Sequence, residues 1–227
     1  MPAVIIFVID HLTSLHMSTL ATEDLEQLRA HFWGEDRVEV VSVDGKSYST
    51  IDLTLFDLKL NSRPDSFLLV RDEYILAYDA ILKDTLYQPM GWRRSATLVT
   101  GQSGIGKTLF LLYVLVRRLQ EKNTVALQIN SNEFALFDER GVNLHSSESG
   151  RVPKGAWALS DSIGEHHGLC SAFERPSVHI IHTSSPASSR WKGWVKRLSA
   201  DRYVMDVWSL KELRTLLYVL SSTALFH

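Results

Sequence analysis

The sequence of 227 residues has little cysteine, almost no excess of charge and no long apolar run. Its single cysteine, Cys170, excludes an internal disulfide and any metal site built from several cysteines. The longest apolar runs, residues 3–9 and 109–116, fall well short of the roughly 20 residues that span a bilayer. Lysine and arginine together number 24, against 26 for aspartate and glutamate, so bulk charge gives no reason to expect nucleic-acid binding.

The first apolar run is followed at once by Asp10 and His11 and has no basic residue before it. This pattern is poor for a secretory signal and favours a strand. We therefore expect an intracellular protein, in the cytoplasm or the nucleus, without a membrane partner. The composition, 45% hydrophobic and 22% charged, is that of a folded chain with a buried core.

Residues 1–66 are predicted to form a small α+β unit. Its expected elements are a strand at 3–9, a helix from Thr22 to about Trp33, and a hairpin of strands 38–43 and 46–55. The Thr22 hydroxyl is followed by two acids, which is typical of a helix start. Asp44-Gly45 predicts the hairpin turn, because both positions need a backbone that reaches positive φ. Ser62-Arg63-Pro64-Asp65 breaks the pattern and places the boundary at residue 66.

Residues 67–227 are predicted to form an α/β domain of the P-loop NTPase class, with a mostly parallel five-stranded sheet flanked by helices. A strand at 67–70 and a helix at 72–87 come first. The five strands are expected at 96–100, 124–130, 156–159, 177–182 and 203–207. A helix at 107–120 is apolar on nearly all sides, and residues 133–146 are interpreted as a hairpin insertion rather than a crossover helix. The last helix starts at Ser209, with Glu212 three residues later in the spacing of a capping box.

The most specific motif lies between the first strand and its helix. It matches Gly-x-x-x-x-Gly-Lys-Ser/Thr, the Walker A or P-loop pattern, in the residues Gly101, Gln102, Ser103, Gly104, Ile105, Gly106, Lys107 and Thr108. Glycines let the backbone turn its amides toward phosphate oxygens, and the helix start adds its positive dipole end. Lys107 is expected to bridge the β- and γ-phosphates, and the Thr108 hydroxyl to bind Mg²⁺. The cofactors predicted are therefore ATP and Mg²⁺.

A triphosphate site also needs a carboxylate at the end of a neighbouring strand. Asp161, after the strand at 156–159, is the candidate for the second magnesium residue, and a solvated acid that caps the next loop is the alternative. Ser162 follows where hydrolytic members of this class often carry a glutamate, which argues against fast hydrolysis. Glu165 and Glu133 are weaker candidates for that role.

Polar residues also end the fourth strand, in the run His182-Thr183-Ser184-Ser185-Pro186. A side chain here either hydrogen-bonds the γ-phosphate or its attacking water, or caps a turn. Arg190 is a further candidate for phosphate contact, as a sensor or finger. The basic and aromatic segment around Trp191 and Trp194 is interpreted as an amphipathic helix with buried tryptophans and solvated cations, and nucleic-acid contact is the alternative. Histidine spacing predicts no structural zinc, and Cys170 is expected to be buried.

With these residues assembled, the second region resembles the P-loop ATPase module of the Crinkler and retrotransposon hot spot proteins of fungi, oomycetes and trypanosomes. The resemblance covers about residues 67–220. The matching stretches are Leu69-Val70-Arg71-Asp72-Glu73-Tyr74, Gly101–Thr108 with Leu109-Phe110-Leu111-Leu112-Tyr113, Trp157-Ala158-Leu159-Ser160-Asp161-Ser162, Ser184-Ser185-Pro186, Arg190-Trp191-Lys192, Tyr203-Val204-Met205 and Trp208-Ser209-Leu210-Lys211-Glu212-Leu213.

This resemblance implies an ATPase domain of the additional-strand class, related to signalling NTPases. In that family the domain is often fused to a nuclease-like or kinase-like effector and is associated with host or nuclear targets. Carried over by position, Lys107 and Thr108 take the phosphate-loop roles and Asp161 the magnesium role. The sequence ends at His227, soon after the tryptophan–serine segment, so we expect a truncated relative or an output by change of shape that a protein partner reads.

The leading hypothesis is an ATP-binding switch or slow ATPase. One alternative is an interaction module that binds nucleotide without hydrolysing it, which Ser162 favours over a fast enzyme. A P-loop small-molecule kinase is the other, and it would need an arginine-rich lid. No motif distinguishes ATP from GTP, and none indicates an oligomeric state.

Overall fold

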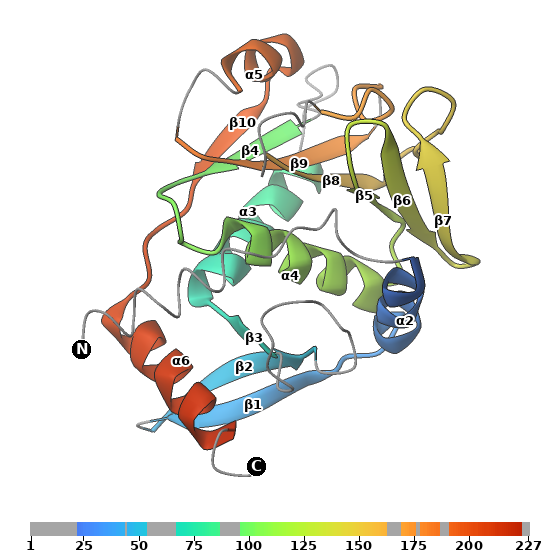
Figure 1. The fold of residues 1–227 in the computed structure, drawn as a ribbon. Helices are drawn as coiled ribbons and strands as arrows, with labels where there is room; N and C mark the ends of the chain where they lie inside the picture. Colours follow the sequence, from blue (N-terminus) through green and yellow to red (C-terminus); the bar gives the residue numbers. More distant parts are fainter. Residues whose placement is uncertain are drawn as a thin grey trace.

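The computed structural model describes residues 22–43, 45–53, 67–86, 96–162, 169–175, 178–186 and 191–223, and two sheets with helices between and around them make up this part (Figure 1). The helices are α2 Thr22–Phe32, α3 Asp72–Leu86, α4 Lys107–Gln120, α5 Lys192–Leu198 and α6 Leu210–Thr223. The strands are β1 Val38–Val43, β2 Lys46–Asp52, β3 Phe67–Val70, β4 Ala96–Thr100, β5 Val125–Gln128, β6 Glu133–Asp138, β7 Gly141–Ser146, β8 Trp157–Asp161, β9 His179–Ser184 and β10 Asp201–Val204. The strand predicted at 3–9 lies outside the described residues.

The smaller sheet has the order β1-β2-β3 and is antiparallel throughout. The predicted hairpin is confirmed by the β1–β2 pairing, and Gly45 in its turn has φ 75°. The strand β3 pairs with β2, with Leu69 opposite Thr50. The two strands lie on opposite sides of the domain boundary predicted at residue 66. The boundary itself stays a prediction.

The larger sheet corrects the expected number of strands. Among the described residues it has seven strands in the order β10-β4-β9-β8-β5-β6-β7, so the prediction of five strands is wrong. Its first four neighbour pairs are parallel and its last two are antiparallel. The hairpin at 133–146 is present as predicted. It extends the sheet because β6 pairs with β5 in antiparallel orientation, which makes the sheet mixed.

Helix α4 lies between the two sheets (Figure 1). Most of its 14 residues are buried, which confirms the expectation from its apolar sequence. Its side chains share one core with those of both sheets, of α2 and of α3. Each buried leucine, valine or phenylalanine contributes about 1.5–3 kcal/mol. The start of α4 is therefore held in place by packing along the whole helix.

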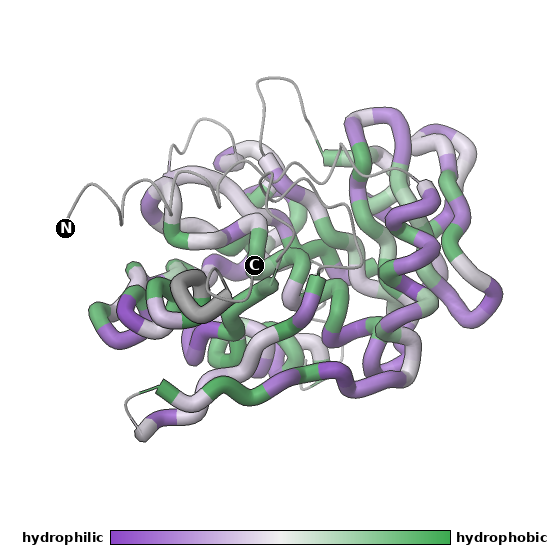
Figure 2. Tube along the Cα trace, turned by 60° about the horizontal axis from the view of Figure 1, so that its bottom comes forward, coloured by the Kyte–Doolittle hydropathy of each residue, from purple (hydrophilic) through white to green (hydrophobic). Residues whose placement is uncertain are grey.

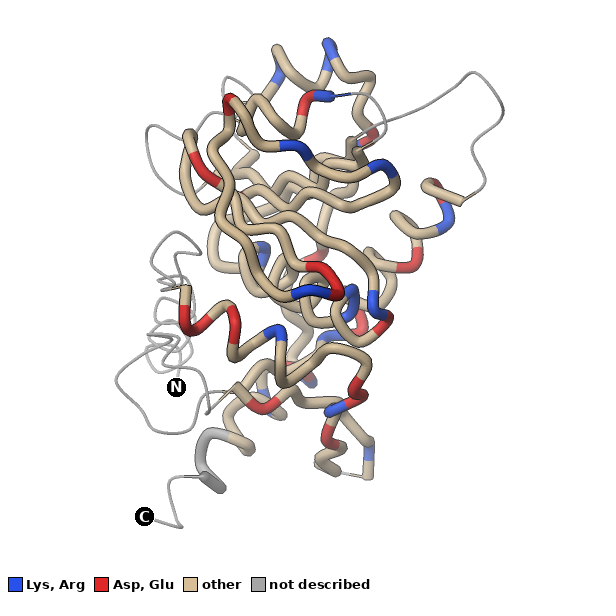
Figure 3. The backbone as a smooth tube through the Cα atoms, turned by 90° about the vertical axis from the view of Figure 1, so that its right-hand side faces the viewer, with Lys and Arg blue, Asp and Glu red and all other residues tan. Residues whose placement is uncertain are grey.

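The hydropathy and charge of the chain follow this arrangement. Hydrophobic segments gather in the interior, and hydrophilic stretches lie at the outer turns and on the outer helices (Figure 2). Lysine and arginine are interspersed with aspartate and glutamate along the coloured part of the tube (Figure 3).

Cys170 is fully buried, as expected, in a second core on the other side of the large sheet. Within the described ranges, the helices are all too short or too polar to cross a membrane.

His182 lies in β9, a strand whose residues are all buried. Its Nδ1 is 3.0 Å from the Ser160 hydroxyl, and its ring meets the ring of Trp194 edge to face. Burial lowers the pKa of His182 from its usual 6.5 to about 4. The imidazole is therefore neutral in the folded protein at pH 7.

This histidine should make stability depend on pH. Because the unfolded chain binds the proton more readily, the free energy of unfolding is retained above about pH 6.5 and falls as pH drops toward 4. We expect a loss of about 2 kcal/mol between pH 7.5 and 5. Urea unfolding at several pH values measures it. His182→Gln should flatten this slope, and a slope equal to that of the wild type would contradict the assignment.

Candidate functional site

The predicted phosphate loop connects β4 to α4. Gly106 is the N-cap residue of α4, with φ 90°, and no side chain caps the first turn by a hydrogen bond. The first turn also lacks an acidic residue. The amides at this end therefore keep their partial positive charge, which suits an anion.

Two glycines of the loop lie too close to neighbouring atoms to carry a side chain. A Cβ on Gly101 would come within 2.5 Å of the Ile105 side chain and 2.8 Å of the Met205 carbonyl oxygen. A Cβ on Gly106 would come within 2.3 Å of the Tyr74 hydroxyl. Both glycines have positive φ, at 150° and 90°. The motif glycines thus serve close packing as well as turning.

The loop is held from behind through its carbonyl groups. Arg71 donates to the Ile105 carbonyl at 2.9 Å, and the Tyr74 hydroxyl donates to the Gly106 carbonyl at 2.9 Å. In a trans peptide the N–H points opposite to the C=O. These bonds therefore turn the amides of Gly106 and Lys107 away from Arg71 and Tyr74.

Lys107 folds back over the loop. Its ammonium donates to the carbonyls of Gly101, at 3.1 Å, and Gln102, at 2.6 Å. Burial lowers the pKa of Lys107, and the charge of Asp161 opposes this shift. The cation thus lies beside the loop, where two neutral carbonyls hold it.

Asp161 lies beside the loop, and it is the last residue of β8 rather than a residue after the strand. Its carboxylate accepts a hydrogen bond from Thr108 at 2.6 Å and another from Thr183 at 2.7 Å. Thr183 belongs to β9, which lies between β4 and β8, and is in register with Asp161. The parallel strands β4, β9 and β8 are neighbours in the sheet. Their carboxyl ends thus bring together the loop, the Thr183 hydroxyl and the Asp161 carboxylate.

Burial raises the pKa of the Asp161 carboxyl. Hydrogen bonds from Thr108, Thr183 and the Ser162 amide, and the charge of Lys107, act in the opposite direction. Burial is the largest of these effects, so the ionised carboxylate is in a less favourable environment than in water. A cation at this position would stabilise it.

Some of the other predicted site residues lie outside the described part of the chain, and the rest can be placed. Arg190 and Glu165 lie outside the described residues. Glu133 begins β6, and its carboxylate accepts from Asn130 at 2.9 Å. The Ser162 amide donates to the Thr183 carbonyl at 3.0 Å, so the position after Asp161 continues the strand pairing. The basic and aromatic segment forms α5, as interpreted, with Trp191 buried beside it and its cations exposed.

Sequence reasoning missed the residues behind the loop, which are Arg71, Tyr74 and Glu212. Arg71 is only 1% exposed and pairs with Glu212 at 3.0 Å. The capping box was predicted and is present, with the Ser209 amide donating to Glu212 and the Glu212 amide to the Ser209 hydroxyl. All three residues lie in stretches that carry the family resemblance, but neither those stretches nor an arginine directly after an apolar strand indicates a contact with the loop.

With this geometry established, comparison with known proteins adds one relationship. The chain is similar to Crinkler effector proteins. It is 28% identical over 152 residues to Crinkler effector protein 15 of Phytophthora infestans, and equally to Crinkler effector protein 16 of the same organism. Each match covers 62% of this chain and 23% of the relative, so the chain spans about a quarter of their length. No family model matches the chain. The similarity supports a Crinkler-like relationship.

The contact between Gly106 and Tyr74 can be tested against a matched glycine. Gly155 also has positive φ, at 83°, but a Cβ there would meet nothing within 4 Å. Gly155→Ala should therefore cost only the backbone strain of about 1–2 kcal/mol. Gly106→Ala should cost at least about 1 kcal/mol more, because Tyr74 is fully buried and cannot move aside. Urea unfolding of the two variants measures the difference, and equal losses would refute the close-packing role.

Proposed function

We propose that this chain binds ATP with Mg²⁺ at residues 101–108 and Asp161, in a P-loop NTPase domain, and acts as a nucleotide-dependent switch or slow ATPase in a Crinkler-like protein. The observation that carries the proposal is the 2.6 Å contact between Thr108 and Asp161. These residues are 53 positions apart, and each was assigned to magnesium from a different part of the sequence. Their meeting at one sheet edge is what a shared metal requires.

The strand order supports the same proposal. The strand that ends at the loop, β4, and the strand that ends at Asp161, β8, are separated by β9. This inserted strand is what the resemblance to the additional-strand class implies. Thr183 at the end of β9 points to Asp161, so it belongs to the candidate magnesium group as well as to the strand end expected near the γ-phosphate.

The residues present fit the nucleotide and the ion. The uncapped start of α4 and the turned amides of Gly106 and Lys107 suit phosphate oxygens. Hydroxyl and carboxylate oxygens are the ligands that Mg²⁺ prefers, and Thr108 and Asp161 supply them. Bound ATP would supply a γ-phosphoryl group for transfer to water. Lys107 would then exchange its two loop carbonyls for phosphate oxygens, which are stronger acceptors.

The rest of the site favours slow hydrolysis of ATP, or none. Ser162, after Asp161, has no group that can take a proton from water at neutral pH. Both oxygens of Asp161 are already engaged by hydroxyl groups, so this carboxylate acts as a ligand rather than as a base. The alternative of nucleotide binding without turnover rests on the same two observations. In either case the output would be a change of shape read by a protein partner, as suits relatives named as effector proteins.

Removal of the Lys107 ammonium tests the binding site. Lys107→Ala should weaken ATP binding at least tenfold, because a charge-assisted hydrogen bond to phosphate is worth about 1.5–3 kcal/mol. Isothermal titration calorimetry measures the dissociation constant. Lys154→Ala, the same change at an exposed position, should keep the wild-type affinity. Equal affinities in all three proteins would show that the loop does not bind the phosphates.

Asp161→Asn should raise the stability of the nucleotide-free protein and abolish the effect of Mg²⁺ on ATP binding. Since burial raises the pKa of Asp161, the ionised carboxyl makes folding less favourable at pH 7 than a neutral amide would. The melting temperature without nucleotide should therefore rise, by about 2–4 °C for each kcal/mol relieved. The gain in ATP affinity on adding Mg²⁺ should disappear, and phosphate release from ATP or GTP should fall to background.

The control for this variant is Asp84→Asn, on the exposed end of α3. It should change neither the melting temperature nor the magnesium effect. If Asp161→Asn instead keeps the full magnesium effect, the ion is held elsewhere.

A further inference from the structure

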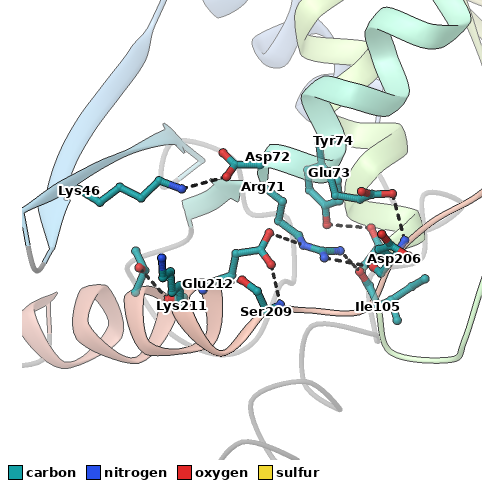
Figure 4. A network of polar contacts seen from close by, with 12 residues as sticks. Lys46, Arg71, Asp72, Glu73, Tyr74, Ile105, Asp206, Ser209, Lys211 and Glu212 are labelled. Carbon is teal, nitrogen blue, oxygen red and sulfur yellow. Dashed lines mark hydrogen bonds and ion pairs between the residues drawn. The ribbon is translucent and has the colours of Figure 1, made fainter.

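Arg71 is the most buried charged side chain of the described chain, at 1% exposure. It stands between the end of β3 and the start of α3, and its guanidinium reaches three different segments (Figure 4). Its Nε donates to Glu212 at 3.0 Å, one Nη to the Ile105 carbonyl at 2.9 Å and the other to the Asp206 carbonyl at 3.1 Å. The rings of Trp208 and Tyr74 lie 4.5 Å and 5.5 Å from its central carbon.

A cation in this position is costly unless every donor finds a partner. The three bonds need a planar group whose donors point in fixed and different directions. A lysine ammonium at the same place would lack this fork, so the site is specific for arginine. Such an arrangement is not required for filling space, because leucine or methionine would fill it without the cost of a buried charge.

One branch of this network reaches the phosphate loop. The Ile105 carbonyl is fixed by Arg71, and the next carbonyl, of Gly106, is fixed by the Tyr74 hydroxyl. Both donors come from the junction of β3 and α3. The loop amides that face the candidate phosphate site are therefore aimed by residues that do not line that site.

The other branch reaches α6. One carboxylate oxygen of Glu212 accepts from Arg71, and the other accepts from the Ser209 amide and so caps the helix. Buried side chains of α6 pack on the small sheet, in a cluster of Leu216 with Val43, Tyr48 and Leu69. Glu73 completes the connection, since it accepts from the Asp206 amide and the Tyr203 hydroxyl. The last helix is thus tied to the loop through one guanidinium.

We propose that Arg71 is a positioning residue for the phosphate loop, and that its pair with Glu212 makes attachment of α6 depend on the state of that loop. The second half rests on the proposed ATP binding. When bound phosphate orders the loop, the Ile105 carbonyl accepts the hydrogen bond of Arg71 in a fixed position. Arg71 is then oriented to pair with Glu212. Linkage is reciprocal, so release of α6 must in turn weaken nucleotide binding by the same factor. The structure thereby assigns α6 and the small sheet as the part that responds to nucleotide.

Hydrogen exchange of backbone amides tests both halves. The first comparison needs no nucleotide. Glu212→Gln keeps an acceptor for the helix cap but removes the charge that pairs with Arg71. Amides of residues 102–108 should exchange about tenfold faster in this variant, although Glu212 does not contact the loop. Ser209→Ala, which weakens the cap and leaves the ion pair, should speed exchange at the start of α6 and leave the loop as in the wild type.

The second comparison adds ATP and Mg²⁺. In the wild type, amides of residues 210–219 should exchange more slowly with nucleotide, in parallel with those of the loop. The double variant Arg71→Met/Glu212→Gln removes the buried ion pair and keeps an acceptor for the Ser209 amide, so α6 keeps its cap and the protein should stay folded. It should bind ATP at least tenfold more weakly while its circular dichroism spectrum remains that of the folded wild type, and α6 should no longer respond. A purely structural role would lower the melting temperature and spare the affinity.

The possible failures are distinct. If loop exchange in Glu212→Gln equals that of the wild type, Arg71 does not position the loop. If ATP protects the loop of the wild type and leaves α6 unchanged, the coupling is wrong and the ATP site stands. If ATP protects neither segment of the wild type, the proposed function fails, and the first comparison alone still decides the positioning role.

Discussion

The burial of α4 between two sheets is the constraint on which the rest of the structure depends. A helix that is apolar on nearly every side has only one stable place, which is inside. Once it is there, both sheets must pack against it, and its first residue stands at a fixed point relative to the ends of β4, β9 and β8. The loop before it then has little freedom. Close packing of the helix thus sets the position of polar groups that a glycine-rich turn by itself would leave loose.

Much of this could be predicted from local patterns. The motif at 101–108 predicts a loop between a strand and a helix, because three glycines, a lysine and a threonine follow an apolar run, and β4 and α4 flank it as expected. Asp161 was assigned because parallel strands place their carboxyl ends at the same edge of a sheet, and its contact with Thr108 is the geometry that such reasoning expects. The hairpin at 133–146 and the capping box at Ser209 were also correct, since turn residues and caps act within a few positions.

What could not be predicted depends on pairs far apart in the sequence. Nothing in β6 alone shows that its partner is β5, so the hairpin was taken as an insertion and the sheet as five-stranded. The pairing of β3 with β2 was equally hidden, because a short apolar strand fits either sheet. Arg71 and Glu212 are 141 positions apart, and each has an ordinary local reading, as a strand end and as a helix cap. Only the folded chain shows that one guanidinium serves the loop and the last helix together.

The same pair has a consequence for how the protein is made. Arg71 and the apolar face of the small sheet leave the ribosome long before the helix that covers them. At typical rates of translation, the 141 residues between Arg71 and Glu212 take roughly 7 to 28 s to synthesise. During that interval Val43, Tyr48 and Leu69 lack the cover that α6 gives them. The nascent chain would therefore expose these apolar side chains to water, and a chaperone could protect them, until α6 is synthesised and packs on the small sheet.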